Sequence, residues 1–372
     1  MTVEDTVTDQ DEPEADVAER RMRRLHLLRM VLVAIWAAGV IAFLVTEGLP
    51  TSRVLMLLWP LVGLAAATVG SRRFLLVLRD FLPLLVILAV FTYLRGISDN
   101  LGMPTWWQPQ ISAERFLFFG HIPTLWLQEH LKDATPQWWD VLVALVYLSF
   151  FVLPSATAAV LWWRNRREFY RWSTRYVTLS FLGFAVFALA PSAPPWAAAR
   201  CTPGKVLGHP NAPKCMSSHE HLHGGGLIGL AAHPHPGAAP WVERITTNGL
   251  SLIHFDVAKN WGTGGLASFD PVAAFPSLHA GTAMLFALFM WHRVRRSLRV
   301  VLAIYPLAMT FSLVYSGEHY VVDCLAGFAA AVLVMFALGR IEGRVAAWRR
   351  RDHTADTSDQ VDTSDPVPEP AV

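Results

Sequence analysis

The stretch "FPSLHAGTAM", residues 275–284, opens an apolar segment that continues to Trp291. The segment has nearly the length that a helix needs to cross a bilayer. A proline, a serine and a histidine nevertheless stand at its front. Ionisable groups inside membranes are rare and tend to be functional. The stretch therefore predicts a membrane helix with a chemical site at one end.

The composition supports a membrane protein. The chain has 372 residues, of which 53% are hydrophobic and 16% are charged. The first fraction is above the soluble range and the second is below it. A formal net charge of +2 is too balanced to indicate a nucleic-acid partner. The alternative, buried helices of a soluble protein, fits poorly because so many long uncharged runs rarely form a soluble core.

Apolar runs of nearly membrane-crossing length recur along the chain, and they predict an all-α, polytopic bundle of about eight transmembrane helices. The predicted helices cover residues 29–46, 54–70, 75–94, 139–161, 176–191, 276–291, 300–316 and 321–339.

The basic residues predict an orientation. The basic cluster "RRMRRLHLLR" (20–29) precedes the first predicted helix, "RNRREFYRWSTR" (164–175) follows the fourth and "RVAAWRRR" (344–351) follows the last. With a cytoplasmic N-terminus, every cluster falls on the cytoplasmic side, as the positive-inside rule requires. We therefore expect both termini in the cytoplasm of a multi-pass plasma-membrane protein. The lack of organelle signals favours a bacterial membrane.

Four regions follow from this topology. Residues 1–24 and 343–372 are predicted to be disordered tails, because these largely polar ends bury too little apolar surface to offset chain entropy. Accessory transmembrane helices occupy 25–94, and a catalytic core occupies 95–342. Within the core, the connection 95–137 is expected to form helices at the membrane interface. The outer loop 192–275 has no obvious secondary structure, and loops of that length are usually functional or disordered.

The outer loop contains Cys201 and Cys215, whereas Cys324 falls in the last helix. An oxidising outer compartment permits a Cys201–Cys215 disulfide, and two free thiols are the alternative. The same loop is rich in histidine, in "HPNAPKCMSSHEHLHGGG" (209–226). Its spacing matches no familiar metal site. We therefore interpret these residues as solvated histidines, with weak metal binding as the alternative.

Three polar motifs fall on the predicted outer side. "APSAPPW" (190–196) ends the fifth helix, "FPSLHAG" (275–281) begins the sixth and "YSGEHYVVDCLAG" (315–327) begins the eighth. We expect them to converge at one membrane depth. Pro276 suits the first turn of a helix. The free N–H groups of that turn and the hydroxyl of Ser277 would then form a cradle for a phosphate group.

Two histidines and one aspartate have the chemistry for phosphoryl transfer. His319 and Asp323 are four residues apart and therefore share a helix face. The carboxylate can hold the proton on one ring nitrogen and leave the other free to attack. His279 is suited to protonating a leaving oxygen. The alternative is that each histidine only bonds to a neighbouring helix.

These motifs resemble the type 2 phosphatidic acid phosphatase superfamily, and within it the inositol phosphorylceramide synthase branch, the aureobasidin target in fungi. The resemblance covers roughly residues 90 to 340 and is carried by "APPW", "FPSLHAG" and "HYVVD". It implies that His319 is the nucleophile, Asp323 its partner and His279 the general acid. It also implies a reaction without metal or cofactor that moves a phosphoryl headgroup from a lipid to an alcohol or to water.

The sequence departs from the wider superfamily in the motifs that are expected to bind the phosphate. Leu278 replaces the glycine of Pro-Ser-Gly-His, and Leu313 stands where an arginine is usual. The basic first motif has no counterpart, and the synthase branch is similar in lacking these features. The departures leave open which cation neutralises the phosphate. Arg95, Lys259 and Arg244 are the outer-side candidates, with Arg95 preferred for its position at a helix end.

Tyr315 and Trp196, from the third and first motifs, complete the predicted substrate-binding set. The predicted function is an integral membrane lipid phosphatase or phosphotransferase that acts at the extracytoplasmic face through a phosphohistidine. Its partners are a lipid phosphate or phospholipid, membrane lipids and an inositol-type or lipid alcohol acceptor. The alternatives are a transporter or flippase, for which inverted repeats are missing, and a non-catalytic scaffold. The sequence indicates no oligomeric state.

Overall fold

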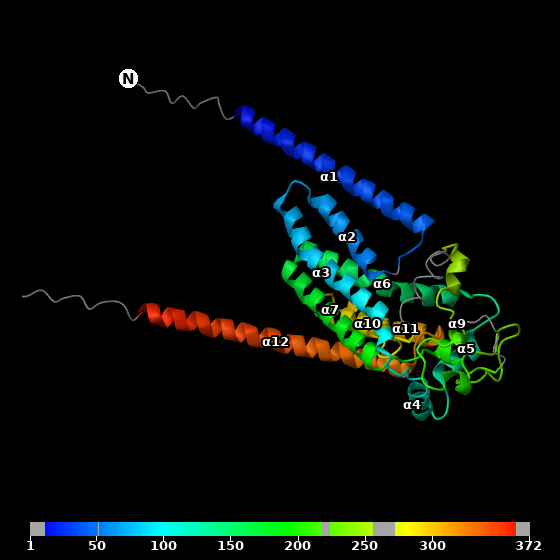
Figure 1. Ribbon diagram of the computed structural model, residues 1–372. Coiled ribbons are helices and arrows are strands. Elements are labelled where there is room, and N and C mark those ends of the chain that lie inside the picture. Colours follow the sequence, from blue (N-terminus) through cyan, green and yellow to red (C-terminus); the bar gives the residue numbers. More distant parts are fainter. Residues whose placement is uncertain (1–11, 51, 218–223, 256–271, 362–372) are drawn as a thin grey trace, which may run out of the picture.

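A computed structural model describes residues 12–50, 52–217, 224–255 and 272–361. Within these ranges the secondary structure is helical, apart from isolated bridges that join Trp106 to Ser192 and Ser192 to Ala273. Long helices form a bundle, and short helices and loops gather at one end of it (Figure 1). The all-α prediction is confirmed for the described part of the chain.

The long apolar helices overlap the predicted segments. They are α1 (Glu12–Thr46), α2 (Arg53–Thr68), α3 (Arg72–Ile97), α6 (Trp138–Arg164), α7 (Arg166–Leu189), α10 (Leu278–Met290), α11 (Leu298–Tyr315) and α12 (Val321–Val361). Six of the helices in the described ranges are long and apolar enough to cross a membrane, whereas α2 and α10 are shorter. The predicted set of about eight therefore divides into full-length spans and two short helices.

Several predicted boundaries are wrong. Helix α1 begins at Glu12 and α12 continues to Val361, so the described parts of both predicted tails are helical. The basic segment 164–175 is mostly helix as well, since α6 and α7 are separated by Asn165 alone. The Asn165 side chain accepts hydrogen bonds from the backbone of Arg167 and Glu168. It thereby caps α7, as asparagine commonly does at a helix start.

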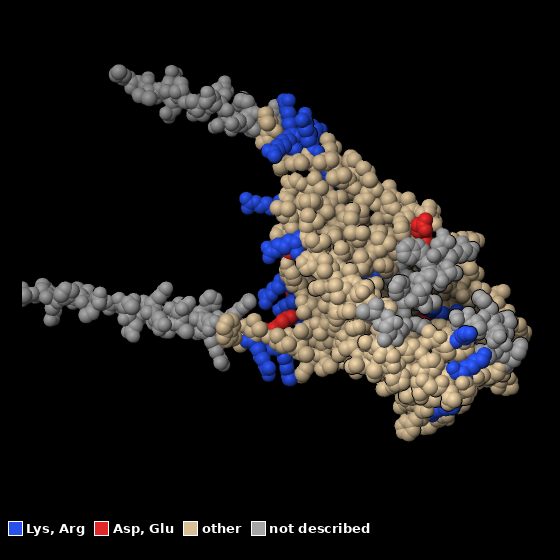
Figure 2. Space-filling model, in the orientation of Figure 1, with Lys and Arg blue, Asp and Glu red and all other residues tan. Residues whose placement is uncertain are grey.

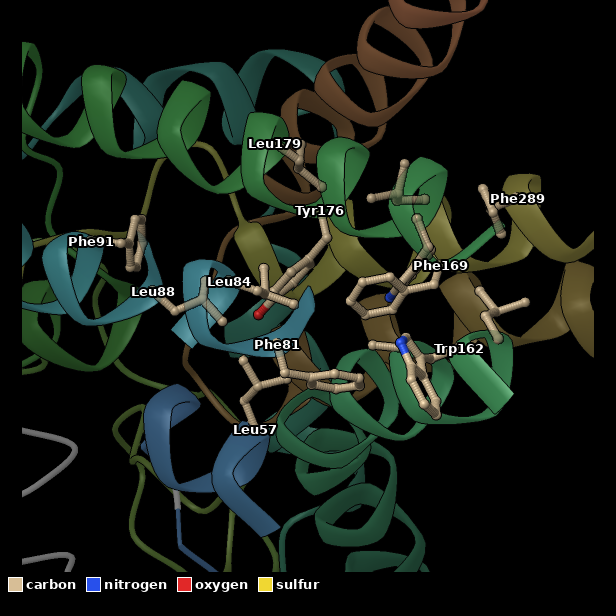
Figure 3. Close-up of a cluster of buried hydrophobic side chains, with 14 of the residues drawn as sticks. Leu57, Phe81, Leu84, Leu88, Phe91, Trp162, Phe169, Tyr176, Leu179 and Phe289 are labelled. Carbon is tan, nitrogen blue, oxygen red and sulfur yellow. The ribbon is translucent and has the colours of Figure 1, made fainter. Parts of the chain in front are cut away.

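The largest buried cluster joins α2, α3, α6, α7, α10 and α12. Figure 3 shows its aromatic part, in which Phe81 of α3 lies near Phe169 of α7 and Trp162 of α6. Beside this cluster, buried Asp80 accepts hydrogen bonds from Trp162 and Arg166. Close side-chain packing and such interhelical bonds hold helices together where lipid provides no hydrophobic drive.

Charge is distributed unevenly over the molecule. Figure 2 shows Lys and Arg side chains gathered along one edge of the helical body, where the long helices α1 and α12 extend outward. This arrangement is the one that the positive-inside rule predicts for a cytoplasmic edge. The orientation itself stays a prediction.

The opposite end of the bundle carries a packed cap. Its first part comprises η1 (Ser98–Leu101), α4 (Pro109–Leu117) and α5 (Pro123–Leu131). Its second part comprises α8 (Pro195–Ala198), η2 (Pro203–Val206), α9 (Lys214–Ser217) and η3 (Asn248–Ile253). Residues from both parts share a buried cluster that includes Trp107, Ile111 and Trp196. The described outer loop is therefore folded against the connection that precedes α6.

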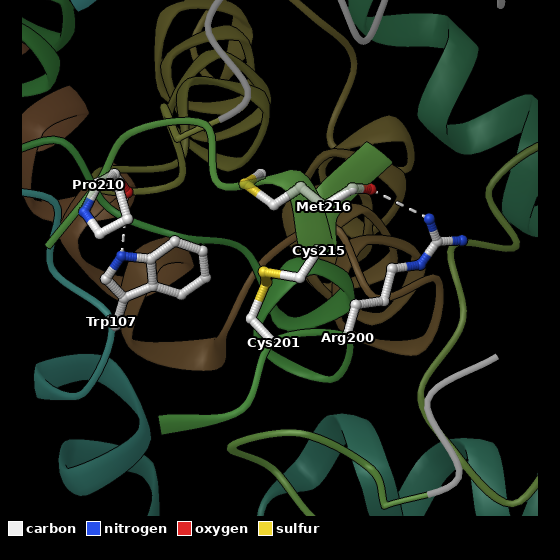
Figure 4. Close-up of a disulfide and its surroundings, with 6 residues drawn as sticks. All are labelled: Trp107, Arg200, Cys201, Pro210, Cys215 and Met216. Atoms are coloured by element: carbon white, nitrogen blue, oxygen red, sulfur yellow. Dashed lines mark hydrogen bonds between the residues drawn. A yellow bond between two sulfur atoms is a disulfide. The ribbon is translucent and has the colours of Figure 1, made fainter. Parts of the chain in front are cut away.

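A disulfide joins Cys201 and Cys215 inside this cap. Figure 4 shows it between the segments of α8 and α9. Nearby, the Arg200 guanidinium donates to the Met216 carbonyl at 3.1 Å. The Trp107 indole donates to the Pro210 carbonyl at 3.3 Å. The disulfide and the Arg200 bond close the outer loop on itself, and the Trp107 bond ties the loop to the connection that precedes α6.

Candidate active site

The site is assembled where α10 crosses α12. The backbone N–H of Ser277 donates to the Asp323 carbonyl at 2.9 Å. A Cβ atom on Gly281 would lie 2.9 Å from the Gly327 carbonyl oxygen, and one on Gly327 would lie 2.2 Å from the Ser277 carbonyl oxygen. Real Cβ atoms do not approach so closely. Both glycines are therefore needed to bring the second and third motifs together.

This crossing places the two predicted catalytic histidines side by side. The ring centroids of His279 and His319 are 5.6 Å apart. His319 is largely buried at 6% exposure, and Asp323 is fully buried. The three residues lie close together, as the sequence predicts. Their catalytic roles stay a prediction.

The hydrogen bonding of His319 differs from the prediction. Its Nδ1 lies 2.9 Å from the Ala274 carbonyl oxygen and 3.6 Å from Asp323 Oδ2. Because a carbonyl only accepts, Nδ1 carries the proton and Nε2 keeps its lone pair. Asp323 Oδ2 instead accepts from the backbone N–H of Tyr320 at 2.9 Å. The tautomer is thus held by the carbonyl, while Asp323 contributes a negative charge beside the ring.

His279 lies among aromatic rings. Its centroid is 4.9 Å from that of Tyr147 and 4.0 Å from that of Phe150. Within the described structure its Nε2 atom is buried and has no hydrogen-bond partner. A buried polar atom without a partner calls for an explanation. An oxygen of a bound substrate would give it one.

Pro276 and Ser277 have roles other than those predicted. Helix α10 begins at Leu278, so Pro276 precedes the helix instead of occupying its first turn, and its peptide bond with Phe275 is cis. Ser277 is the N-cap residue, and its hydroxyl accepts from the Ala280 N–H at 3.3 Å. The hydroxyl is fully buried. These residues shape the start of α10, and the predicted contact of the Ser277 hydroxyl with an anion stays a prediction.

Tyr315 is also not placed as a substrate ligand. Its side chain is fully buried, and its hydroxyl lies 2.9 Å from Asp140 Oδ1 and 3.2 Å from the Leu131 carbonyl oxygen. Both atoms are acceptors, so the hydroxyl proton is already engaged. The residue joins α11 to α6 and α5. Its hydroxyl has partners within the fold, and its substrate-binding role stays a prediction.

Trp196 serves as a platform for arginine. The guanidinium carbon of Arg244 is 5.6 Å from its ring centroid, and that of Arg200 is 5.8 Å away. The Nε atom of Arg244 donates to Glu318 at 2.7 Å. Glu318 directly precedes His319 in the chain. Trp196 thus orients a cation beside the histidine pair.

Three arginines lie within electrostatic reach of His279. The charges of Arg53, Arg95 and Arg244 all act on the His279 ring. Arg95 and Arg244 were predicted from the sequence, whereas Lys259 lies outside the described residues. Arg53 was missed. The available signal was a basic residue in the predicted outer turn 47–53, on the side where the positive-inside rule does not expect one.

Glu114 of α4 is a second residue that the sequence did not reveal. Its carboxyl is fully buried, and Oε1 accepts from the Val322 N–H at 3.2 Å. Burial raises the pKa of Glu114 to about 7, and the charge of Asp323 adds to this shift. A single acid in a short amphipathic helix carries no distinguishing signal. Only the packing of α4 on the start of α12 brings it to the site.

Leu278, which replaces the family's glycine, is accommodated by α7. A Cβ atom on Gly183 would lie 2.6 Å from the Leu278 Cδ2 atom. Leu278 is buried at 6% exposure. The larger side chain at the motif is therefore matched by a glycine on the neighbouring helix.

Comparison with known proteins agrees with this geometry. The family model of the PAP2 superfamily matches residues 111–337. The chain belongs to the PAP2 superfamily. The matched region extends from α4 into α12 and includes His279, His319 and Asp323. Arg53 and Arg95 precede it.

The chain is also similar to the inositol phosphorylceramide synthase catalytic subunit aur1 of Schizosaccharomyces pombe. The two are 24% identical over 292 residues, which are 74% of this chain and 57% of the relative. The chain therefore spans less than two thirds of the relative's length. This similarity supports the predicted branch of the superfamily. No solved structure shows a significant match to the chain.

Proposed function

We propose that this protein transfers the phosphoryl group or phosphoryl headgroup of a lipid at the extracytoplasmic face, through a phosphohistidine at His319. Family membership and the similarity to a synthase support a membrane lipid phosphatase or phosphotransferase. The observation that carries the finer proposal is the pairing of His279 and His319, with ring centroids 5.6 Å apart. The Nε2 atom of His319 keeps its lone pair, and the Nε2 atom of His279 has no hydrogen-bond partner among the described residues.

The first step follows from the two nitrogens. The Nε2 lone pair of His319 attacks phosphorus and forms the N–P bond. The bond between phosphorus and the leaving oxygen breaks, and protonated His279 gives its proton to that oxygen. Asp323 stabilises the positive charge on the His319 ring. The products are a phosphohistidine, a neutral His279 and the released alcohol.

The second step reverses the roles. Neutral His279 takes a proton from the acceptor, which is water or an alcohol, and the acceptor oxygen attacks phosphorus. The N–P bond then breaks and the electron pair returns to His319 Nε2. Water as acceptor gives hydrolysis, whereas an inositol-type or lipid alcohol gives a new phosphodiester if phosphorus still carries its headgroup and a phosphomonoester if it does not. The arginines near His279 stabilise the phosphate charge during both steps.

An assay with detergent-purified protein tests this proposal. Lipid phosphates and phosphodiesters are supplied with and without inositol or a lipid alcohol, and the products are separated. Free phosphate that does not depend on acceptor supports a phosphatase, and a new phosphodiester supports a transferase. His319→Ala should lose all activity, and His279→Ala should lose at least about 100-fold. Full activity of His319→Ala would contradict the mechanism.

The proposed face of action has its own test. Single cysteines introduced into the described part of the outer loop, 224–255, should react with a membrane-impermeant reagent in intact cells. Cysteines placed in the basic edge, such as Arg296→Cys, should react only after the membrane is opened. The reverse pattern would overturn the orientation.

A further inference from the structure

Arg53 begins α2 and lies among aromatic side chains. Its guanidinium carbon is 4.5 Å from the ring centroid of Phe91, 5.3 Å from that of Phe150 and 5.9 Å from that of Tyr176. Its Nη1 atom donates to the Ser180 hydroxyl at 3.1 Å. The residue is half-buried. Aromatic faces attract a guanidinium, but they do not neutralise its charge.

Among the described residues, no carboxylate forms an ion pair with Arg53. Two other arginines differ in this respect, since Arg244 of the cap pairs with Glu318 and Arg166 of α7 pairs with Asp80. A charge in apolar surroundings is costly unless an opposite charge accompanies it. Arg53 is therefore a cation whose partner is not part of the described protein.

The position of Arg53 connects it to the histidine pair. The ring of Phe150 contacts both groups, because its centroid is 5.3 Å from the Arg53 guanidinium and 4.0 Å from the His279 ring. The charge of Arg53 also acts on His279. A phosphate held between His279 and His319 would thus lie close to this guanidinium.

We propose that Arg53 binds the non-bridging oxygens of the lipid's phosphate. This inference rests on the proposed function and names the cation that the sequence left open. A guanidinium suits the task because its planar fork donates two parallel hydrogen bonds to one oxyanion. Arg244 is already paired with Glu318 and orients the site from the cap. Arg53 precedes the matched family region, so the N-terminal helices complete the site and are not merely accessory.

The test compares Arg53→Gln and Arg53→Lys with the wild type. The measurements are kcat/KM for the lipid substrate and the inhibition constant of orthovanadate, a phosphate analogue. Arg53→Gln should lower kcat/KM by about 10- to 100-fold and should weaken vanadate inhibition by a similar factor. Arg53→Lys keeps the charge but loses the planar fork of donors. Its kcat/KM and its vanadate inhibition constant should therefore lie between those of the wild type and of Arg53→Gln. The matched control is Arg73→Gln, since Arg73 lies over Trp163 in the first turn of α3 and should leave both constants unchanged.

Three outcomes are decisive. Unchanged constants in Arg53→Gln would overturn the inference, and if His319→Ala were still inactive the proposed function would stand. Weaker vanadate inhibition with an unchanged kcat/KM for the lipid would mean that Arg53 binds only inorganic oxyanions, which also overturns it. A parallel loss of kcat/KM and of vanadate inhibition in Arg53→Gln, together with an inactive His319→Ala, supports the inference.

A second measurement uses the unmodified protein, so it does not depend on a variant that folds. Phenylglyoxal modifies arginine side chains, and mass spectrometry measures the extent at each position. Orthovanadate should slow modification of Arg53 severalfold and leave Arg73 unaffected. Equal modification of Arg53 with and without orthovanadate would contradict the inference.

Discussion

The carboxylate of Glu114 accepts a hydrogen bond from the backbone N–H of Val322, with 3.2 Å between oxygen and nitrogen. Helix α4 of the cap thereby satisfies an N–H group at the start of α12. The first N–H groups of a helix have no partner within the helix. The segment that contains His319 and Asp323 is thus held from outside the bundle.

The buried Glu114 predicts a pH dependence of stability. Burial raises its pKa from 4.5 to about 7, so the folded protein binds this proton more tightly than the unfolded chain does. The contribution of Glu114 to the free energy of unfolding is therefore complete below pH 4.5 and falls as the pH rises towards about 7. Glu114→Gln keeps the acceptor and removes the titration, so its melting temperature should vary less with pH over this range. Melting curves in detergent test this, and an unchanged pH profile would count against it.

The hydrogen bond from Val322 to Glu114 and the titration of Glu114 can be tested separately. Glu114→Ala removes the acceptor for Val322 as well as the titration, so relative to Glu114→Gln we expect it to lower the free energy of unfolding by about 1 kcal/mol at any pH. Glu114→Gln should not show this constant loss. Equal stability of the two variants would mean that the hydrogen bond contributes nothing.

Tyr315→Phe separates a structural from a substrate-binding role. The hydroxyl bonds within the fold, to Asp140 or Leu131, so its removal should lower the free energy of unfolding by about 1–3 kcal/mol. Activity per folded molecule should stay within about two-fold of the wild type, because no substrate contact is lost. Tyr93→Phe is the matched control, since Tyr93 is 69% exposed. A raised KM without a change in melting temperature would instead restore the role predicted from the sequence.

Gly183 and Leu278 should behave as a coupled pair. Glycine to alanine normally stabilises a helix interior by about 0.5–1 kcal/mol. Gly39→Ala in α1 should show that gain, because nothing lies within 4 Å of its added Cβ. Gly183→Ala should destabilise the protein and reduce activity, because the new methyl group meets Leu278 at the start of α10. The double variant with Leu278→Ala should recover part of the loss. Additive effects in a double-mutant cycle would refute the coupling.

The disulfide should stabilise the cap. Cys201 and Cys215 are separated by 14 positions in the sequence. A closed loop of about that length contributes about 3 kcal/mol by restricting the unfolded chain. Replacing both cysteines by serine should lower the melting temperature, and a thiol reductant should do the same to the wild type. The reductant should have no effect on the serine variant, and an effect there would mean that it does not act through this disulfide.

The bundle was predictable because span length and hydrophobicity are local properties of the sequence. The segments of α6 and α11 were found close to their observed bounds. Helix ends were harder, since Asn165 restarts a helix within one residue of the end of α6. The predicted range 321–339 is shorter than α12 because the polar extension of this helix has no apolar pattern.

The candidate site was predictable only in part. His279, His319 and Asp323 stand in motifs of recognisable spacing, and their convergence followed from the alternation of the helices. Arg53 and Glu114 were missed because their positions depend on packing against Phe150 and on the start of α12. The capping role of Ser277 was not predicted although a local rule was available. A serine just before a helix usually caps it with its side-chain oxygen.

The short α10 determines how far the reacting groups lie from water. Its 13 residues span about 20 Å, whereas the hydrocarbon layer is about 30 Å thick. Arg293, which follows α10, pairs with Glu168 near the start of α7. If this end of α10 lies at the cytoplasmic boundary of the layer, as the predicted orientation has it, the start of α10, with His279, lies below the opposite boundary. Under the proposed function an acceptor would then have to leave water to reach phosphorus, and we expect the partitioning of the acceptor to this depth to set the balance between hydrolysis and transfer.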